Sequence, residues 1–343
     1  MDGTGSGIMS LLLGLRDKQV VDGSLIFTVL LCAAIVAMGG ALSQFEIIPH
    51  PEDPLVYEWQ LAEQTAWGQL TAWLGFALHQ LLIWATIAYA QRRYSKRDYT
   101  DKLRPVNTWA LGINFVFIIL HYLQTLFFYD AIAQDLPSWT AQFAVALMLI
   151  VILGMENQRR GLFFGKKVPF RKAFTDGLRK YHGYFFSFAV IYTFWFHPMI
   201  PTLGHLVGFI HVVLVMAQGS LMFMRAHLNK HWMLLLEILV LPHAFQVAIN
   251  QGNDLWPMFF FGFAAIFLVT QMHGLRLKPW ARRAFYGSFT LLALYVYIFL
   301  RQPWEANEII RIPVIEYVVL FAMYLIYWLS AKLSSGIRGL TSS

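Results

Sequence analysis

Apolar residues in this chain run on for about twenty positions at a time instead of alternating with polar ones. A helix rises about 1.5 Å per residue, so a run of about 20 apolar residues spans the hydrocarbon core of a bilayer. Ten such runs can be marked: 24–44, 65–90, 107–129, 138–154, 182–200, 204–224, 231–250, 255–273, 284–300 and 313–331. The pattern predicts an all-α, polytopic integral membrane protein of about ten transmembrane helices. We expect residues 1–343 to form a single transmembrane domain.

The segment ahead of the first run, residues 1–23, combines a short apolar stretch at 8–15 with Arg16 and Lys18. Such a stretch is typical of an interfacial segment that lies along the membrane surface. The length of this leader favours a retained first anchor over a cleaved signal peptide.

Composition supports the membrane interpretation and removes several classes of function. With 58% hydrophobic and 13% charged residues, the chain is far too apolar for a soluble domain of this length. The net charge of +7 does not indicate a nucleic-acid partner, because basic residues in membrane proteins mark cytoplasmic loops. One cysteine, Cys32, allows no intrachain disulfide. The chain contains no CxxCH, HExxH, GxSxG or Walker-type sequence, which excludes covalent c-type haem, zincin and P-loop chemistry.

Basic residues gather at alternate ends of the predicted helices. With a cytoplasmic N-terminus, 24 of the 26 Lys and Arg residues fall in cytoplasmic segments, and only Arg301 and Arg311 fall outside. The cytoplasmic segments are 16–18, 91–106, 155–181, 225–230, 274–283 and 332–338. A helix missed or invented in mid-chain would move every later loop to the other side and destroy this split. The count therefore predicts an integral membrane protein with both termini inside, N-in/C-in.

The main cytoplasmic loop, 155–181, holds eight basic residues interleaved with four phenylalanines. This composition is typical of a loop that rests on anionic lipid headgroups. A docking site for a soluble or membrane partner is the alternative.

Four histidines fall at one depth near the membrane centre when residues are counted from the helix ends: His79, His121, His211 and His243. An ionisable residue inside a membrane helix is costly and marks a functional site by default. Each also shares a helical face with small or polar residues. These companions are Ala72, Gly75 and Thr86 for His79; Asn114, Gln124 and Thr125 for His121; Gly204, Gly208 and Gln218 for His211; Gln246 and Asn250 for His243. Pro242, next to His243, predicts a kink.

The remaining histidines flank this slab. His197 and His205 lie at the outer surface near His50, and either join the buried set or form a separate outer site. His182, His227, His231 and His273 lie at inner helix ends, where the sequence assigns them no role. His227 and His231 form one HxxxH box, whereas a membrane di-iron site needs several.

One carboxylate, Glu237, is interpreted as lying deep in a helix. It is either a protonated structural acid or part of a proton path. The other residues of such a path would be Asn114, Gln218, Gln246 and Asn250.

The leading functional interpretation is a membrane-embedded metal or haem redox protein, an oxidoreductase if the chain is an enzyme. Imidazole is a ligand for iron, copper and zinc and the axial ligand of b-type haem. The four central histidines would bind the cofactor, with His197 and His205 as further metal ligands. Its substrate would be lipid-soluble, such as a quinone, an isoprenoid or an acyl chain.

Three alternatives remain open at the level of sequence. The same polar residues could line the path of a proton-coupled transporter or channel for a small solute or ion. The chain could be a non-catalytic subunit of a membrane complex that binds partners through loop 155–181. Each histidine could also be a neutral imidazole that joins helices by hydrogen bonds to Gln, Thr or backbone carbonyls.

Overall fold

The computed structural model describes residues 15–48, 58–94, 99–250, 252 and 254–341. Regular structure in these residues is helical, and their β pairing is limited to isolated bridges. Nine helices of the described chain are long and apolar enough to cross a membrane. The prediction of an all-helical chain is thus confirmed, and a multi-pass membrane protein is supported. The interfacial segment expected at 8–15 lies, apart from Leu15, outside the described residues.

The chain divides into two compact units, which are described one at a time. Unit 1 comprises Met1–Val145 and Gly183–Asp254, and unit 2 comprises Ala146–His182 and Leu255–Ser343. Two helices, α5 (Trp139–Arg160) and α6 (Lys172–Phe196), have residues in both units. The single transmembrane domain stays a prediction.

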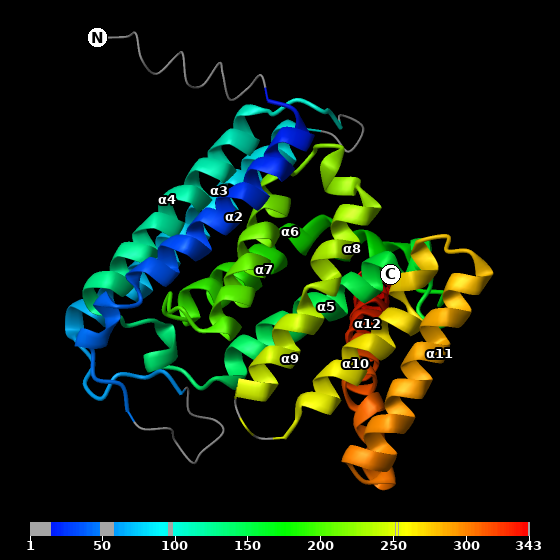
Figure 1. Cartoon of the computed structure of the whole chain (residues 1–343). Coiled ribbons are helices and arrows are strands. Elements are labelled where there is room, and N and C mark those ends of the chain that lie inside the picture. The colour runs from blue at the N-terminus through cyan, green and yellow to red at the C-terminus, as the bar shows by residue number, and fades with distance from the viewer. Residues whose placement is uncertain (1–14, 49–57, 95–98, 251, 253, 342–343) are drawn as a thin grey trace. The chain divides into compact units, whose positions relative to one another are not determined.

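Unit 1 is built around α7. Its helices are α2 (Asp17–Met38), α3 (Ala66–Arg93), α4 (Pro105–Phe128), α7 (Leu203–Ser220), α8 (Lys230–Ile238) and α9 (Val240–Asn250). Short 3-10 turns are η1 (Ala41–Gln44), η2 (Ile132–Gln134) and η3 (Ala226–Leu228). In this unit α3 packs along α4, while α7 contacts α2, α4, α8 and α9 (Figure 1). Polar residues that face α7 are therefore buried between helices.

Capping residues, more than hydropathy, set the helix ends. In α3, the Thr65 hydroxyl accepts a hydrogen bond from the Gly68 amide at 3.0 Å and so satisfies a free donor of the first turn. Helix α2 starts seven residues before its apolar run, with Asp17 in the first turn, where a carboxylate complements the helix dipole. It ends at Met38, before Gly39.

The apolar run 231–250 folds as two helices that separate at Leu239. Proline has no N–H, so Pro242 leaves the carbonyl of Ile238 without its usual helical donor. Helix α8 ends at Ile238, and α9 begins at Val240. The kink predicted beside His243 is confirmed, and it lies at the carbonyl that the proline frees.

Three basic segments of unit 1 meet at one end of it. Isolated bridges pair Arg16 with Lys102, and Thr100 with Met224. The leader of α2, the 99–104 segment and the 223–229 segment are therefore neighbours in space. The charge count predicts these same three segments on one side of the membrane.

Unit 2 contains the three helices that follow unit 1 in the chain. They are α10 (Trp256–Val269), α11 (Pro279–Tyr295) and α12 (Glu308–Thr341), with the 3-10 turns η4 (Gln271–Gly274) and η6 (Pro303–Asn307) and the π-helical turn η5 (Val296–Leu300). Helix α10 packs against α11 and, more extensively, against α12. Gly262 permits this close approach, because a Cβ there would lie 2.9 Å from Ile312.

The sequence predicts ten spans, whereas the described chain has nine candidates. The helix that accounts for the difference is α6. It has 25 residues, but its first half carries Lys172, Asp176, Arg179 and Lys180, which lower its mean hydropathy. Only its second half is continuously apolar.

Loop 155–181 folds as the end of α5, a turn at 161–171 and the start of α6. Phe170 and Phe174 are buried in a core cluster with Leu162 and with Leu320 of α12. Phe163 and Phe164, which are 37% and 58% exposed, are the two that remain available to headgroups or a partner. Both of those roles stay predictions.

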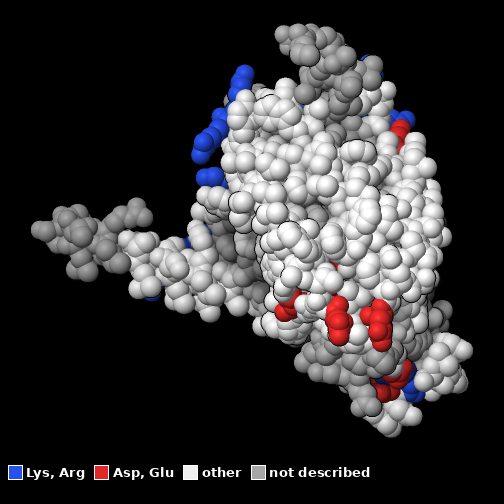
Figure 2. Space-filling view, turned by 90° about the vertical axis from the view of Figure 1, so that its left-hand side faces the viewer, with Lys and Arg blue, Asp and Glu red and all other residues white. Residues whose placement is uncertain are grey.

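The outer faces of the helices are apolar, as lipid contact requires. Most of the surface seen in Figure 2 carries no Lys, Arg, Asp or Glu. On α2, Ile26, Val29 and Leu30 are each more than 60% exposed. In water such a patch would favour aggregation, whereas lipid chains cover it without cost.

Candidate functional site

His79, fully buried on α3, has hydrogen bonds at both ring nitrogens. The indole N–H of Trp195 lies 3.3 Å from Nδ1 and donates to it. The proton is therefore on Nε2, which donates to the Asn114 side-chain oxygen at 2.8 Å. Phe117 stacks on the ring, with centroids 4.6 Å apart. In this conformation neither nitrogen of His79 has a lone pair to offer a metal.

The hydrogen bonds continue from His79 into the next helices. Asn114 on α4 donates to the Ser220 hydroxyl of α7 at 2.9 Å, and that hydroxyl donates to the Met216 carbonyl. Residues of α6, α3, α4 and α7 are thereby joined in one buried chain. Gly75, one turn before His79, makes room for the Trp195 indole, which occupies the position where a Cβ would stand. His79 thus has the joining role that sequence reasoning left open.

His121 differs from His79 although it is equally buried. Its Nε2 donates to the backbone carbonyl of His197 at 2.9 Å. Its Nδ1 is buried and has no hydrogen-bond partner among the described residues. The rings of Trp195 and Phe194 surround it, with centroids 4.4 and 4.9 Å away. The Gln124 side chain and the Phe194 backbone also lie near the ring. A lone pair that forms no regular hydrogen bond is available to a proton or a metal ion.

His197 and His205 join the buried set in the structure. Their ring centroids are 5.5 Å apart, and the ring of Trp59 packs edge-on against His205 at 4.6 Å. The hydroxyl of Thr202 accepts from the His205 amide and lies 2.6 Å from the ring Nδ1. Thr202 is the N-cap of α7, so the cap that starts the helix also orients His205.

His211 and His243 bring α7 and α9 together. Their ring centroids lie 6.4 Å apart. Gly208 makes room for His243, because a Cβ at this position would be 2.9 Å from its Nε2. His243 also lies near His197 and His205. Gly208 therefore allows α9 to pack closely against α7.

All six candidate histidines lie in unit 1 and form a series of neighbours, from His79 and His121 through His197 and His205 to His243 and His211. They do not converge on one point. Within the described residues there is no group of three or more His, Cys, Asp or Glu side chains that could hold a metal ion. The metal and haem assignments stay predictions.

The other residues of the predicted proton path are engaged in helix contacts. Gln218 donates to the His227 carbonyl at 3.0 Å and accepts from the Trp232 indole at 2.7 Å. Gln246 donates to the Asn250 side chain at 2.8 Å. Glu237 is only half-buried on α8.

The inner histidines are scattered. His227 lies in η3, and His231 lies exposed in the first turn of α8, so this HxxxH pair does not share a helix. His182 and His273 belong to unit 2, where the ring nitrogens contact the carbonyls of Arg179 and Leu268. His50 lies outside the described residues.

Sequence reasoning missed a buried aspartate in unit 1. Asp130 follows α4 directly, and one carboxylate oxygen accepts from the Thr65 amide and hydroxyl at 3.2 and 3.1 Å. Burial raises the pKa of the Asp130 carboxyl, and these hydrogen bonds from Thr65 oppose the rise. The sequence feature that could have identified Asp130 is its position, one residue after an apolar run that ends at 129.

Sequence reasoning also missed a second buried carboxylate, which lies in unit 2. Glu316 on α12 is 3% exposed, and its Oε2 has no hydrogen-bond partner among the described residues. It lies within the predicted run 313–331, which is the signal that could have found it.

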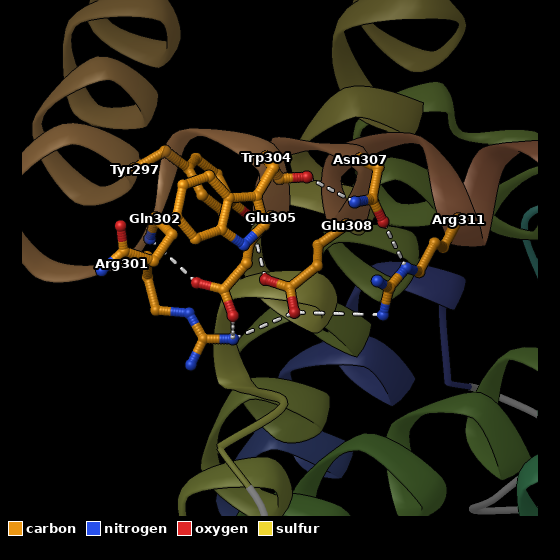
Figure 3. Close-up of polar contacts among 8 residues, drawn as sticks. All are labelled: Tyr297, Arg301, Gln302, Trp304, Glu305, Asn307, Glu308 and Arg311. Atoms are coloured by element: carbon orange, nitrogen blue, oxygen red, sulfur yellow. Dashed lines mark hydrogen bonds and ion pairs between the residues drawn. The ribbon is translucent and has the colours of Figure 1, made fainter.

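Glu308, also in unit 2, shows how a buried glutamate is ordinarily neutralised. Arg301 lies 3.0 Å and Arg311 lies 3.9 Å from its carboxylate, and the Tyr297 hydroxyl donates to it at 3.3 Å. Figure 3 shows these groups converging at the turn between α11 and α12, with Glu305 on the Arg301 side. A buried charge with this many partners is a structural ion network.

Comparison with protein families, curated proteins and solved structures finds no match for this chain. Function must be argued from the geometry of the residues.

Proposed function

We propose that this chain is a ten-span membrane protein that moves protons through unit 1, as a channel or coupled to a small solute or ion. The observation that carries the proposal is the series of six neighbouring histidines, drawn from α3, α4, α7, α9 and the α6–α7 connection. Histidine is the side chain whose ordinary pKa lies closest to neutral pH, and its ring both donates and accepts. Buried histidines at successive positions suit stepwise proton transfer.

The course of α6 in unit 1 supports a tenth span. The Tyr184 carbonyl accepts from the Trp84 indole, and further along α6 the Trp195 indole reaches His79. Residue numbers rise on α6 while they fall on α3, so the two helices run antiparallel. A helix that runs antiparallel along a candidate span crosses the same apolar layer, despite the charges in its first half.

Helix α9 gives the histidine series an element that can move. The break at Leu239 leaves only weak backbone continuity beside His243, with the His243 amide 3.4 Å from the Leu239 carbonyl. Broken helices at membrane depth are the usual place where transporters bind substrate and change shape.

Proton movement can be measured with the purified chain in liposomes that contain a pH-sensitive dye. We expect a potassium diffusion potential, alone or with a panel of amino acids, sugars and organic acids outside, to acidify the lumen faster than in empty liposomes. His121→Phe keeps an aromatic ring but removes the unpartnered nitrogen, so the rate should fall at least about tenfold. His231→Phe, at an exposed site, is the matched control and should keep the rate. Acidification no faster than in empty liposomes under every condition would contradict the proposal.

The second candidate function is the metal or haem redox protein with a lipid-soluble substrate. The observation in its favour is the buried lone pair at His121 Nδ1, with His197 bound to the same ring through its carbonyl. Absorption spectra of the oxidised and reduced protein, with elemental analysis, decide between the candidates. A Soret band, or stoichiometric iron, copper or zinc that is lost in His121→Phe, would favour this one.

A further inference from the structure

Two buried glutamates stand about two turns apart on α12 in opposite surroundings. Glu308 and Glu316 are each 3% exposed. Two arginines and a tyrosine hydroxyl satisfy Glu308. Glu316 has no ion pair and no hydrogen bond at Oε2 among the described residues. An ionised carboxylate in such a site costs many kcal/mol of solvation, so the neutral acid is the stable form.

The groups around Glu316 leave its proton unengaged. Helix α10, which packs along α12, has no ionisable residue in Trp256–Val269. The neighbouring hydroxyl, that of Tyr317, donates to the Leu162 carbonyl at 2.6 Å. Lys166 and Lys167, in the turn at 161–171 that also contains Leu162, are exposed to solvent. Glu316 therefore has no fixed acceptor that would make it a purely structural acid.

Arg160, at the end of α5, is the cation whose charge reaches Glu316. It is itself 3% exposed. A guanidinium that acts on the carboxyl through its charge, and forms no ion pair with it among the described residues, lowers the cost of the carboxylate form. The acid can then exist in both forms at moderate cost.

We propose that Glu316 is a proton-binding site of unit 2, at which the carboxyl group releases its proton to water and takes one up again, with Arg160 as the counter-charge. The O–H bond breaks to give carboxylate and hydronium, and the reverse step restores the acid. This site lies on other residues than the histidine series and does not depend on the function proposed for unit 1.

Infrared difference spectra of the full chain between about pH 5 and about pH 9 test the site directly. We expect the C=O band of a protonated, non-hydrogen-bonded carboxyl to convert to carboxylate bands as the pH rises. Glu316→Gln should remove this band, whereas Glu237→Gln, the same change on a half-buried helical glutamate, should keep it. Arg160→Gln should shift the pH of conversion by at least about one unit. Identical spectra for Glu316→Gln and the wild type would overturn the proposal.

Labelling of the wild type with dicyclohexylcarbodiimide gives an answer that needs no variant to fold. The reagent adds the O–H of a protonated carboxyl in an apolar environment across its C=N bond, and the adduct is located by peptide mass. An adduct on Glu316 but not on ion-paired Glu308 supports the site. Labelling of Glu308 to the same extent, or none on Glu316, contradicts it. Both readouts measure protonation and not flux, so they remain informative if unit 1 proves not to move protons.

Discussion

At the scale of single residues, His79 and His121 show that neighbours, not residue type or burial, decide what a histidine can do. Both rings are fully buried. Trp195 and Asn114 engage both nitrogens of His79 and fix its tautomer, whereas His121 keeps one nitrogen without a partner among the described residues. One is a joint between helices, and the other is chemically available.

Titration of the Asp130 carboxyl should make the free energy of unfolding of unit 1 depend on pH. Its pKa is raised by burial, so the folded state holds this proton at pH values where the unfolded chain has lost it. The stabilisation is complete below the ordinary pKa of about 4 and is lost as pH rises through the raised value. We expect Asp130→Asn to gain thermal stability relative to the wild type as pH rises from about 5 to about 8.

Thermal unfolding in detergent at several pH values checks this expectation. Asp22→Asn, the same change at an exposed position on α2, is the control for the substitution itself. A pH-independent difference for Asp130→Asn would show that the carboxyl does not titrate in the folded chain.

At the scale of elements, close approach between helices depends on where glycines stand. The Trp195 indole fills the space in front of Gly75 on α3, while nothing lies within 4 Å of the Cβ position at Gly112 on α4. Both glycines fall in helices, where glycine is otherwise unfavourable. Only the packing distinguishes them.

The same substitution at the two glycines should therefore have opposite effects. Gly75→Ala forces the buried indole aside, and we expect it to lower the free energy of unfolding by about 1–3 kcal/mol. Gly112→Ala should leave that free energy unchanged or raise it by about 0.5–1 kcal/mol, because alanine favours the helix. Thermal midpoints of the two variants, with Trp195 fluorescence as a local probe, make the comparison. Equal stability of the two would mean that α3 and α6 do not pack as described.

At the scale of the whole molecule, the distribution of charge along the chain predicts the topology. The two basic residues that break the 24-of-26 split are Arg301 and Arg311. Both lie within ion-pair distance of buried Glu308. The buried ion network thus gives both exceptions a structural role, and the N-in/C-in orientation stays a prediction.

Single cysteines placed in a Cys32→Ser background test this orientation. Lys167→Cys and Pro201→Cys flank α6, and Lys278→Cys and Gln302→Cys flank α11. We expect an impermeant maleimide to label positions 201 and 302 in intact cells, and positions 167 and 278 only after permeabilisation. Labelling of 167 and 201 from the same side would mean that α6 does not cross the membrane. The loops after α6 would then lie on the side opposite to the one predicted.

Apolar run length and charge alternation are local properties, so the sequence alone determined the all-helical architecture, the kink caused by Pro242 and the faces of small and polar residues on α3 and α4. These follow from backbone hydrogen bonding in an apolar medium, which leaves helices as the only form for such runs.

The candidate histidines were also found from depth and periodicity. Their surroundings were not, because a hydrogen bond such as His79 to Trp195 joins residues 116 positions apart. Only the tertiary structure decided that both ring nitrogens of His79 have hydrogen bonds while one nitrogen of His121 does not. It also decided that Glu308 is ion-paired while Glu316 has no ion pair among the described residues. Those differences depend on which helices lie together.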